Sequence, residues 1–285
     1  MADRMNTNPR LRVEERIITS ARRSLTELLQ EVFERSEVLF NIATRDIAVR
    51  FRQTYIGLLW LLLKPLAMSV VLFFAFGKIG GLSEKSPASY WLIVLTGIIP
   101  WQYFSLALTE ATNSLGSNRQ LVTHTYIPRL TIPLATMLGL LSDLAISLIV
   151  LVASMIILNI DPTWKLLAFP AVLFVYWLFV FGLGLILSST NAIWRDIQHL
   201  LPFVLQIMLF ASPIGYTSQS VPDRWQFLFC LNPLSGLIEL MRWSIIPNYP
   251  VHVLQYSWAV IASIISLVFG LTVFKHFDHD MADRI

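Results

Sequence analysis

Long apolar stretches follow one another along this sequence, and they constrain the fold more than any other feature. In a helix, about 20 apolar residues are enough to cross the hydrocarbon core of a membrane. Only 14% of the 285 residues are charged, whereas a soluble domain has about 25%. The sequence therefore excludes a soluble globular chain and predicts an all-α integral membrane protein with six transmembrane helices. The predicted spans, within residues 56–275, are Ile56–Phe76, Tyr90–Leu108, Thr131–Leu158, Leu166–Ser188, a fifth that begins with Leu200–Ala211, and Ser257–Phe274.

The basic residues predict how these spans are oriented. Lys and Arg are enriched on the cytoplasmic side of membrane proteins. Most of them fall in segments that would be cytoplasmic if the N-terminus were inside, including the stretch before the first span. An even number of spans then returns the C-terminus to the same side. We therefore expect both termini in the cytoplasm, with residues 1–23 as a flexible cytoplasmic tail and residues 276–285 as a cytoplasmic tail.

Two shorter apolar runs, Arg224–Leu231 and Pro233–Ile246, lie between the fifth and sixth predicted spans. Runs of this length favour re-entrant segments over full crossings. Asn232 is a common helix N-cap, and Pro233 suits the first turn of a helix. We therefore expect a re-entrant helical hairpin that dips into the membrane from the outer side.

The segment before the first span has the pattern of an amphipathic helix. Its apolar residues recur at steps of three and four, while acidic residues occupy the other faces. Ser24 and Glu27 have the spacing of a capping box, which predicts that the helix begins at residue 24. Residues 24–55 are expected to lie in the inner membrane interface, because the basic residues Arg45, Arg50 and Arg52 lead directly into the first span. A helix packed against another subunit is the alternative.

The sequence carries no motif for chemistry of its own. The only Gly-Lys pair, Gly77-Lys78, has Leu72 where a phosphate-binding loop needs a glycine, and no Ser or Thr follows it. The sequence contains no His-Glu-x-x-His or Gly-x-Ser-x-Gly motif, and Cys230 is its single cysteine. The net charge of +3 is too weak to predict nucleic-acid binding. We therefore expect this chain to be no enzyme, to bind no cofactor or metal, and to hydrolyse no ATP by itself.

Two charged residues, Lys64 and Asp143, lie within predicted spans. A charge inside a membrane is costly and usually has a partner or a function. A lysine side chain is long enough to reach a carboxylate on a neighbouring helix. One interpretation is a structural ion pair or a set of hydrogen bonds between helices, and the other is a proton or substrate relay.

Tryptophans gather at the ends of the predicted spans, where interface belts explain most of them. A second role is open to some of them, because an aromatic ring offers a flat apolar face on which a sugar can stack. The candidates for this role are Trp60, Trp101, Trp225 and Trp243. The sequence does not separate the two roles.

Several short motifs together resemble a known family of transporters. The first group is similar to the opening signature of ABC-2-type permeases that export lipid-linked polysaccharides, namely the O-antigen, capsule and teichoic-acid exporters. This group comprises Arg45-Asp46-Ile47, residues 50–54, residues 56–60 and Lys64-Pro65-Leu66. Further similar motifs follow in the expected order, at residues 97–101, 113–118, 126–129, 212–213 and 232–234. Lys64 departs from the pattern, because a neutral, glutamine-like residue is expected there.

The resemblance implies an assembly and a cargo. It implies a homodimer of six-span subunits that encloses a channel, with two copies of a separate ATPase below it that bind the ATP and Mg. It also implies membrane lipids as neighbours and the bacterial inner membrane as the location. The expected cargo is an O-antigen on a polyprenyl pyrophosphate, and the alternative is a capsule polysaccharide or a teichoic acid. A secondary transporter and an integral-membrane glycan or lipid transferase are rivals from other classes, although the signatures of neither are evident.

The same resemblance implies roles for two segments. The amphipathic N-terminal helix would act as a gate near the lipid pyrophosphate, and the segment Ser117–Arg129 would touch the ATPase. The residues expected near the pyrophosphate are Arg45, Arg50 and Arg52, and those expected at the ATPase are Arg119, His124, Tyr126 and Arg129.

Overall fold

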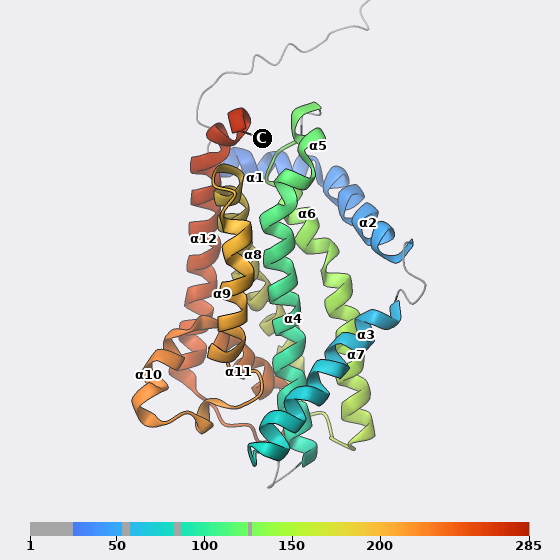
Figure 1. Cartoon of the computed structure of the whole chain (residues 1–285), viewed down its shortest axis with the longest axis vertical. Coiled ribbons are helices and arrows are strands. Elements are labelled where there is room, and N and C mark those ends of the chain that lie inside the picture. Colours follow the sequence, from blue (N-terminus) through green and yellow to red (C-terminus); the bar gives the residue numbers. More distant parts are fainter. Residues whose placement is uncertain (1–24, 53–57, 83–86, 125–126, 285) are drawn as a thin grey trace, which may run out of the picture.

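The computed structural model describes residues 25–52, 58–82, 87–124 and 127–284, and within these ranges the regular structure is helical without a β-strand (Figure 1). In chain order, the α-helices are α1 (Leu25–Glu34), α2 (Ser36–Arg52), α3 (Leu58–Leu72), α4 (Pro87–Ser117), α5 (Arg119–His124), α6 (Thr131–Gly139), α7 (Leu141–Ile157), α8 (Phe169–Ile193), α9 (Ile197–Ala211), α10 (Asp223–Leu231), α11 (Pro233–Ile245) and α12 (Val253–Arg284). A π-helix, η1 (Phe73–Ile79), continues α3, and two 3₁₀-helices, η2 (Trp164–Ala168) and η3 (Ser218–Ser220), precede α8 and α10.

In the part of the chain that the structure describes, five helices are long and apolar enough to cross a membrane. They coincide with the first, second, third, fourth and sixth predicted spans. The predicted fifth span is α9, which has 15 residues and is therefore about 22 Å long at a rise of about 1.5 Å per residue. Because the hydrocarbon core is about 30 Å thick, the count of six spans stays a prediction.

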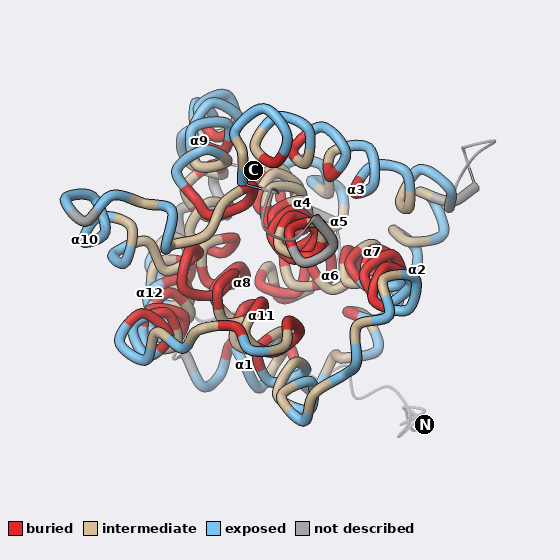
Figure 2. Tube along the Cα trace, turned by 90° about the horizontal axis from the view of Figure 1, so that it is seen from below, coloured by how far each residue is buried: buried red, intermediate tan, exposed pale blue. Residues whose placement is uncertain are grey.

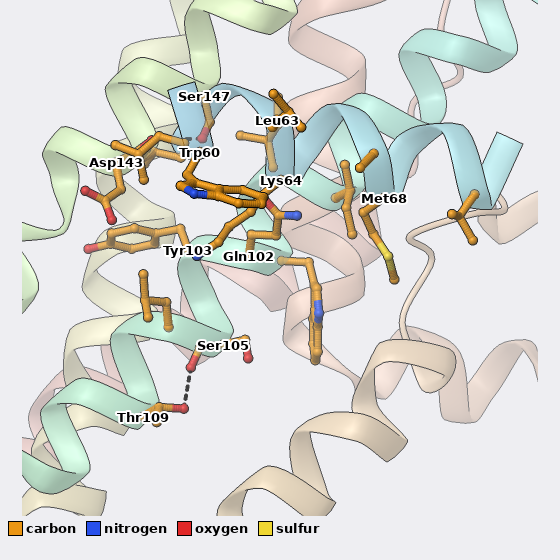
Figure 3. A pocket seen from close by; sticks show the side chains of 18 residues that line it. Trp60, Leu63, Lys64, Met68, Gln102, Tyr103, Ser105, Thr109, Asp143 and Ser147 are labelled. Atoms are coloured by element: carbon orange, nitrogen blue, oxygen red, sulfur yellow. Dashed lines mark hydrogen bonds between the residues drawn. The ribbon is translucent and has the colours of Figure 1, made fainter. Parts of the chain in front are cut away.

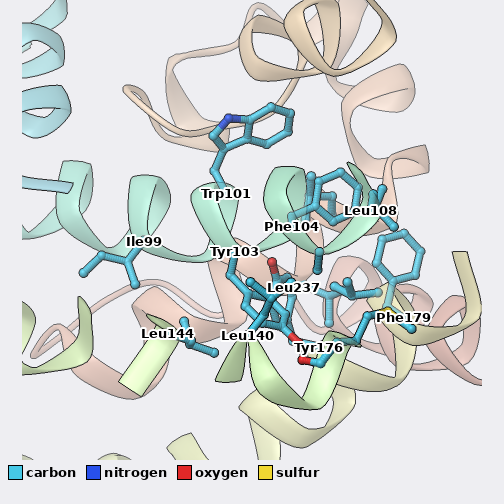
Figure 4. Packing of buried hydrophobic residues seen from close by; sticks show 14 of the residues in the cluster. Ile99, Trp101, Tyr103, Phe104, Leu108, Leu140, Leu144, Tyr176, Phe179 and Leu237 are labelled. Atoms are coloured by element: carbon cyan, nitrogen blue, oxygen red, sulfur yellow. Dashed lines mark hydrogen bonds between the residues drawn. The ribbon is translucent and has the colours of Figure 1, made fainter. Parts of the chain in front are cut away.

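The central helix of the bundle is α4. In its most apolar window 72% of the residues are buried, compared with 17% for the helix that contains α3. Phe104 of α4 is fully buried and stacks on Phe179 of α8, with ring centres 6.3 Å apart (Figure 4). The Tyr176 hydroxyl of α8 donates a hydrogen bond to the Pro100 carbonyl of α4 at 2.5 Å. The core therefore lies around α4 and α8, whereas α3 and α9 lie at the periphery (Figure 2).

Small residues let α8 and α12 approach until their backbones touch. A Cβ atom added to Gly182 would lie 2.3 Å from the carbonyl carbon of Ser266, and one added to Gly270 would lie 2.3 Å from the Gly182 oxygen. The Ser266 hydroxyl donates a hydrogen bond to the Phe179 carbonyl at 3.0 Å. Small residues at helix contacts are the usual basis of close packing between membrane helices.

The helix ends fall into two groups. Figure 1 shows α1, α5 and the C-terminal end of α12 at one end of the molecule, which we call the α5 end. At the opposite end, which we call the α10 end, lie α10 and α11 together with the beginning of α4 and the ends of α3 and α7. The beginning and the end of the described chain thus lie on the same side, as an even number of crossings requires. Which end faces the cytoplasm stays a prediction.

Several boundaries differ from those expected. The amphipathic segment consists of two helices, because a turn at Arg35 separates α1 from α2. The predicted third span is likewise divided at Leu140 into α6 and α7. α12 continues through residues 276–284, which we expected as a tail, and Phe277 packs there against Trp194 with ring centres 5.8 Å apart. The capping residue Ser24 and the tail at residues 1–23 lie outside the described ranges.

The two short helices α10 and α11 lie where the hairpin was expected. Asn232 caps α11 as predicted, because its side-chain oxygen accepts a hydrogen bond from the backbone N–H of Leu234 at 3.1 Å. α10 is largely exposed, whereas α11 is buried against α8 and α12. Whether this pair re-enters the membrane stays a prediction.

Candidate functional site

An open groove between α3, α4 and α7 has a volume of about 610 Å³ (Figure 3). It is lined by two of the candidate sugar-stacking tryptophans and by both charged residues of the predicted spans. Trp60 and Lys64 come from α3, Trp101 comes from α4, and Asp143 comes from α7. We call this space the α3–α4–α7 groove and treat it as the candidate functional site.

Helical spacing explains why these side chains border the same space. Trp60 and Lys64 are four residues apart on α3, and Asp143 and Ser147 are four residues apart on α7. Residues at this spacing project from one face of a helix. The exposed fraction of Trp60 is 48%, whereas that of Trp101 is 6%. Trp60 is therefore accessible to a ligand, and Trp101 is part of the packed wall.

The carboxylate in the groove pairs with an arginine from outside the predicted spans. The Nη1 atom of Arg50, near the end of α2, lies 3.4 Å from Oδ2 of Asp143. The Ser142 hydroxyl donates a further hydrogen bond to Oδ1 of Asp143 at 3.2 Å. Lys64 acts electrostatically on Asp143 but lies beyond ion-pair distance. The structure thus brings Lys64 and Asp143 into one site, with Arg50 rather than Lys64 as the direct partner.

α2 reaches this position because it packs on α6. Leu39, Ile42 and Ala43 of α2 are buried, and a Cβ atom added to Gly139 of α6 would lie 3.3 Å from the Ala43 oxygen. The missing side chain of Gly139 therefore allows the close approach of the two helices. Phe40 remains exposed on another face of α2, so the amphipathic segment contacts its own chain on one side and keeps an apolar surface on the other.

The other two arginines of this segment have different surroundings. The guanidinium of Arg45 pairs with Asp46 at 2.9 Å, and its Nη2 atom donates to the side-chain oxygen of Asn118 at 3.1 Å. Asn118 lies between α4 and α5, so Arg45 links α2 to the segment that was expected to touch an ATPase. The side chain of Arg52 is outside the described part of the structure.

The predicted ATPase-contacting segment lies at the α5 end. Arg119 is exposed on α5, while the side chain of His124 and the whole of Tyr126 are outside the described residues. Arg129 Nη1 lies 3.1 Å from Oδ1 of Asp278 and also donates to the Asp278 carbonyl. Arg129 therefore ties the end of this segment to the C-terminal part of α12.

The remaining two candidate aromatic residues do not line the groove. Trp225 is exposed on α10, with the Arg224 guanidinium 5.8 Å from its ring centre. Trp243 of α11 packs edge-on against Trp164, and the Lys165 ammonium lies 5.3 Å from the Trp243 ring centre. Of the four candidates for sugar stacking, only Trp60 and Trp101 share a cavity.

A buried ion pair near the α10 end was missed by the sequence analysis. Glu239 and Arg242 of α11 have side chains that are 1% and 0% exposed, and they pair at 3.1 Å. Arg242 also donates to the carbonyls of Ile93 and Tyr216, at 2.9 Å in both cases. Its guanidinium accordingly joins α11 to α4 and to the chain that follows α9. The signal was available, because both charges lie within the apolar run from residue 233 to 246.

Glu239 is satisfied by further partners. The Tyr249 hydroxyl donates to Oε2 of Glu239 at 2.6 Å, and the Ser218 backbone N–H donates to Oε1 at 3.0 Å. Burial raises the pKa of Tyr249 far above its usual value of about 10, so its hydroxyl stays protonated and acts as a donor. This arrangement stabilises the packing of α11 and is no open binding site, because its charged groups are enclosed. Within the described ranges, no group of three His, Cys, Asp or Glu residues is placed to hold a metal ion.

The comparisons with known proteins agree over most of the chain. The family model described as ABC-2 type transporter matches residues 37–246, which extend from α2 through α11. The O-antigen export system permease protein RfbA of Klebsiella pneumoniae is 25% identical over 248 residues, covering 87% of this chain and 94% of RfbA. The polysialic acid transport protein KpsM of Escherichia coli is 24% identical, covering 81% of this chain and 90% of KpsM. The capsule polysaccharide export inner-membrane protein CtrC of Neisseria meningitidis is 22% identical, covering 88% of this chain and 95% of CtrC.

Proposed function

This chain belongs to the ABC-2 type transporter family, and on that premise we propose that it is the membrane-spanning subunit of an ATP-driven exporter of a lipid-linked polysaccharide in the bacterial inner membrane. The observation that carries the proposal is the similarity, over more than four fifths of the chain, to proteins whose names specify O-antigen, polysialic acid or capsule transport. The cargo proposed is an O-antigen on a polyprenyl pyrophosphate, which the similarity to RfbA favours. Capsule polysaccharide is the second candidate, because KpsM and CtrC are similar over comparable lengths.

The energy source in this proposal is a separate ATPase, two copies of which bind at the α5 end. This end exposes Arg119 on α5 and Arg195 in the turn between α8 and α9. A cytoplasmic orientation of the α5 end is supported by the enrichment of basic residues in cytoplasmic segments. ATP and Mg then belong to the ATPase, and movement of α5 reaches α2 through the hydrogen bond between Arg45 and Asn118.

The permease is proposed to act as a homodimer that contacts its second copy through α3 and α9. Figure 2 shows both helices on the same side of the molecule, where α3 and α9 carry many exposed residues. The exposed apolar residues there include Leu59, Leu63, Leu66 and Val70 of α3, and Leu200, Phe203, Ile207 and Phe210 of α9. A helix as short as α9 mismatches the bilayer thickness, and association with another helix surface is one way to relieve the mismatch.

The pyrophosphate of the cargo is proposed to approach the C-terminal end of α2, where Arg50 lies. Arg50 is the described residue that best supports this placement, because its side chain is 30% exposed beside the groove while it pairs with Asp143. An arginine has several N–H donors in a planar fork and can serve a carboxylate and a phosphate together. Arg45 and Arg52 are proposed as the neighbouring cations.

Reconstitution tests the proposal as a whole. The full chain is placed in proteoliposomes with its cognate ATPase and with a polyprenyl-pyrophosphate-linked O-antigen. ATP is added outside, where it reaches the complexes whose ATPase faces outwards, and the fraction of glycan that becomes protected from an added lectin is measured. We expect ATP-dependent transfer with the intact ATPase and no transfer when the ATPase carries a substitution of its phosphate-binding lysine. Transfer driven by an ion gradient without ATP would replace the proposal with a secondary transporter. Chemical conversion of the glycan by the chain alone would replace it with a transferase.

A further inference from the structure

The two charged residues that line the α3–α4–α7 groove are Lys64 and Asp143, and the lining residues of α3 beyond Lys64 are apolar. On α3, Lys64 precedes Met68 and Val71 in the groove wall, so the charge lies nearer to α2 and the apolar residues lie further along the helix. Helix α4 runs antiparallel to α3, so its apolar residues at the far end of the groove come earlier in the sequence than its polar ones. Because α4 runs from the α10 end towards the α5 end (Figure 1), Ile98 in its first half lies nearer to the α10 end than Thr109 in its second half.

The charged end of the groove has a surplus of one positive charge. Arg50 and Asp143 neutralise each other in their ion pair. Lys64 is exposed in the groove, and no described residue forms a hydrogen bond or an ion pair with its ammonium group. A lysine at this depth among apolar helices is costly unless an anion accompanies it. The three charged residues therefore have a net charge of +1, which a ligand with one negative charge would balance.

A ligand with an anionic head and a hydrocarbon chain matches both features. We propose that the α3–α4–α7 groove binds one anionic phospholipid of the inner leaflet, with its phosphodiester at Lys64 and an acyl chain along Met68, Val71 and Ile98. The direction of the lipid rests on the proposed cytoplasmic orientation of the α5 end, because the headgroup of an inner-leaflet lipid then lies nearer to α2 and its chain points towards the middle of the membrane. The groove volume of about 610 Å³ lies within the range of about 300–1,000 Å³ that is usual for ligand sites.

The charge balance favours a phospholipid over the lipid part of the cargo. A phosphodiester carries a single negative charge, which equals the surplus of the groove, whereas a pyrophosphate carries more. A bound phospholipid would fill the space between α3 and α7 and would leave Arg50 with its exposed donors directed to a separate ligand. The site would thus act as a structural lipid site beside the proposed path of the cargo.

Lipid retention tests the proposal without glycan or ATP. The full chain is reconstituted with its ATPase in nanodiscs of phosphatidylglycerol and phosphatidylcholine, extracted in mild detergent, and analysed by native mass spectrometry for lipid that remains bound. We expect one phosphatidylglycerol per chain. The variant Lys64→Gln is expected to retain at least fivefold less, while Lys64→Arg retains it because the charge is kept. Met68→Trp is expected to lower retention from the apolar end of the groove with Lys64 intact.

Lys78→Gln is the matched control, because Lys78 is exposed on η1, which continues α3, and does not line the groove. It should leave phosphatidylglycerol retention unchanged. Equal retention in the parental chain and in Lys64→Gln, or equal retention of phosphatidylcholine, would overturn the proposal. Retention of a polyprenyl phosphate or pyrophosphate in place of phosphatidylglycerol, from membranes containing both, would also overturn it. If Lys64→Gln does not fold, phosphatidylglycerol retention is compared between Met68→Trp and Lys78→Gln, and equal retention in these two variants would overturn the proposal. A failure of glycan export in proteoliposomes would contradict the proposed function and would leave the lipid site untouched.

Discussion

Arg50 of α2 and Asp143 of α7 are 93 residues apart in the sequence and form an ion pair of 3.4 Å between Nη1 and Oδ2. The pair connects the amphipathic segment to the second half of the predicted third span at the charged end of the groove. The Arg50 side chain keeps 30% of its surface exposed, so the ion pair does not use all the N–H donors of the Arg50 guanidinium. This geometry makes Arg50 the arginine at which phosphate recognition is best tested.

We predict that Arg50→Lys keeps the ion pair and the topology but weakens stimulation of the ATPase by the lipid-linked glycan. Lysine loses the planar fork that can serve a carboxylate and a phosphate together. Loss of one charge-assisted hydrogen bond, worth about 1.5–3 kcal/mol, should raise the glycan concentration for half-maximal stimulation by about tenfold or more. The measurement is a titration of ATPase activity in the assembled complex.

Asp143→Asn is the matched variant for this prediction. It removes the competing carboxylate and should leave stimulation at or above the parental level, although the protein becomes less stable. If Arg50→Lys exports at the parental rate, and responds to glycan as the parental complex does, phosphate recognition by Arg50 is to be abandoned. A role in positive-inside orientation would then suffice, because lysine and arginine are equivalent in that role.

The second prediction concerns the enclosed pair Glu239 and Arg242. Arg242→Ala leaves a carboxylate buried without its cation, which typically costs about 3–5 kcal/mol. We therefore expect severe loss of folded protein and a large fall in the unfolding temperature. Arg224→Ala serves as the control, because Arg224 is exposed on α10, where its guanidinium lies near the Trp225 ring. This substitution should cost about 1 kcal/mol or less. Thermal unfolding in detergent compares the two, and equal unfolding temperatures would show that the buried pair contributes little.

The regular elements of this fold were largely predictable from the sequence, because each depends on local pattern. The apolar runs of five predicted spans coincide with long apolar helices. The start of α11 was predicted at Asn232-Pro233, since an N-cap and a first-turn proline act within a few residues. Such features do not depend on how distant segments pack.

The relationships within the site were less predictable, because they depend on packing between distant segments. The sequence selected Lys64 and Asp143 but did not identify Arg50 as the partner of Asp143. That contact requires α2 to lie close against α6, which Gly139 permits. The break at Leu140 directly follows Gly139, and this single glycine within an apolar run was not enough to predict the break. The pair of Glu239 and Arg242 was overlooked because its i,i+3 spacing is equally typical of an exposed helix face.

The third prediction concerns the contact between α8 and α12. Gly182→Ala places a methyl group where the Ser266 backbone lies 2.3 Å away, so the two helices must separate. Overpacking of this kind costs about 1–3 kcal/mol or more. Gly116→Ala is the matched control, since nothing lies within 4 Å of a Cβ atom added at that helical glycine, and it should be neutral or slightly stabilising. Thermal unfolding and the yield of monodisperse protein are the measurements, and similar values for the two variants would contradict the close packing.

The fourth prediction separates two roles for Arg129. Replacing Tyr126 and Arg129 together should reduce export while membrane insertion stays intact, because this segment is proposed to contact the ATPase. If Arg129 acts only through its ion pair with Asp278, Asp278→Asn should reduce export as much as Arg129→Ala does. We expect the smaller effect from Asp278→Asn, since that variant keeps the arginine at the α5 end. Co-purification of the ATPase and export are measured for each variant, and unchanged values in the double variant of Tyr126 and Arg129 would remove the coupling role.

The fifth prediction concerns orientation and uses the native cysteine. Cys230 is exposed on α10, and the α10 end is proposed to face the outside. In spheroplasts, an impermeant thiol reagent should label the parental chain and should not label Cys230→Ser. Within the Cys230→Ser background, Asn248→Cys should be labelled from outside, because Asn248 is exposed near α11. Arg195→Cys, which lies in the exposed turn between α8 and α9, should react only after the membrane is made permeable. The reverse labelling pattern would invert the topology, and it would place the proposed ATPase contacts on the wrong side of the membrane.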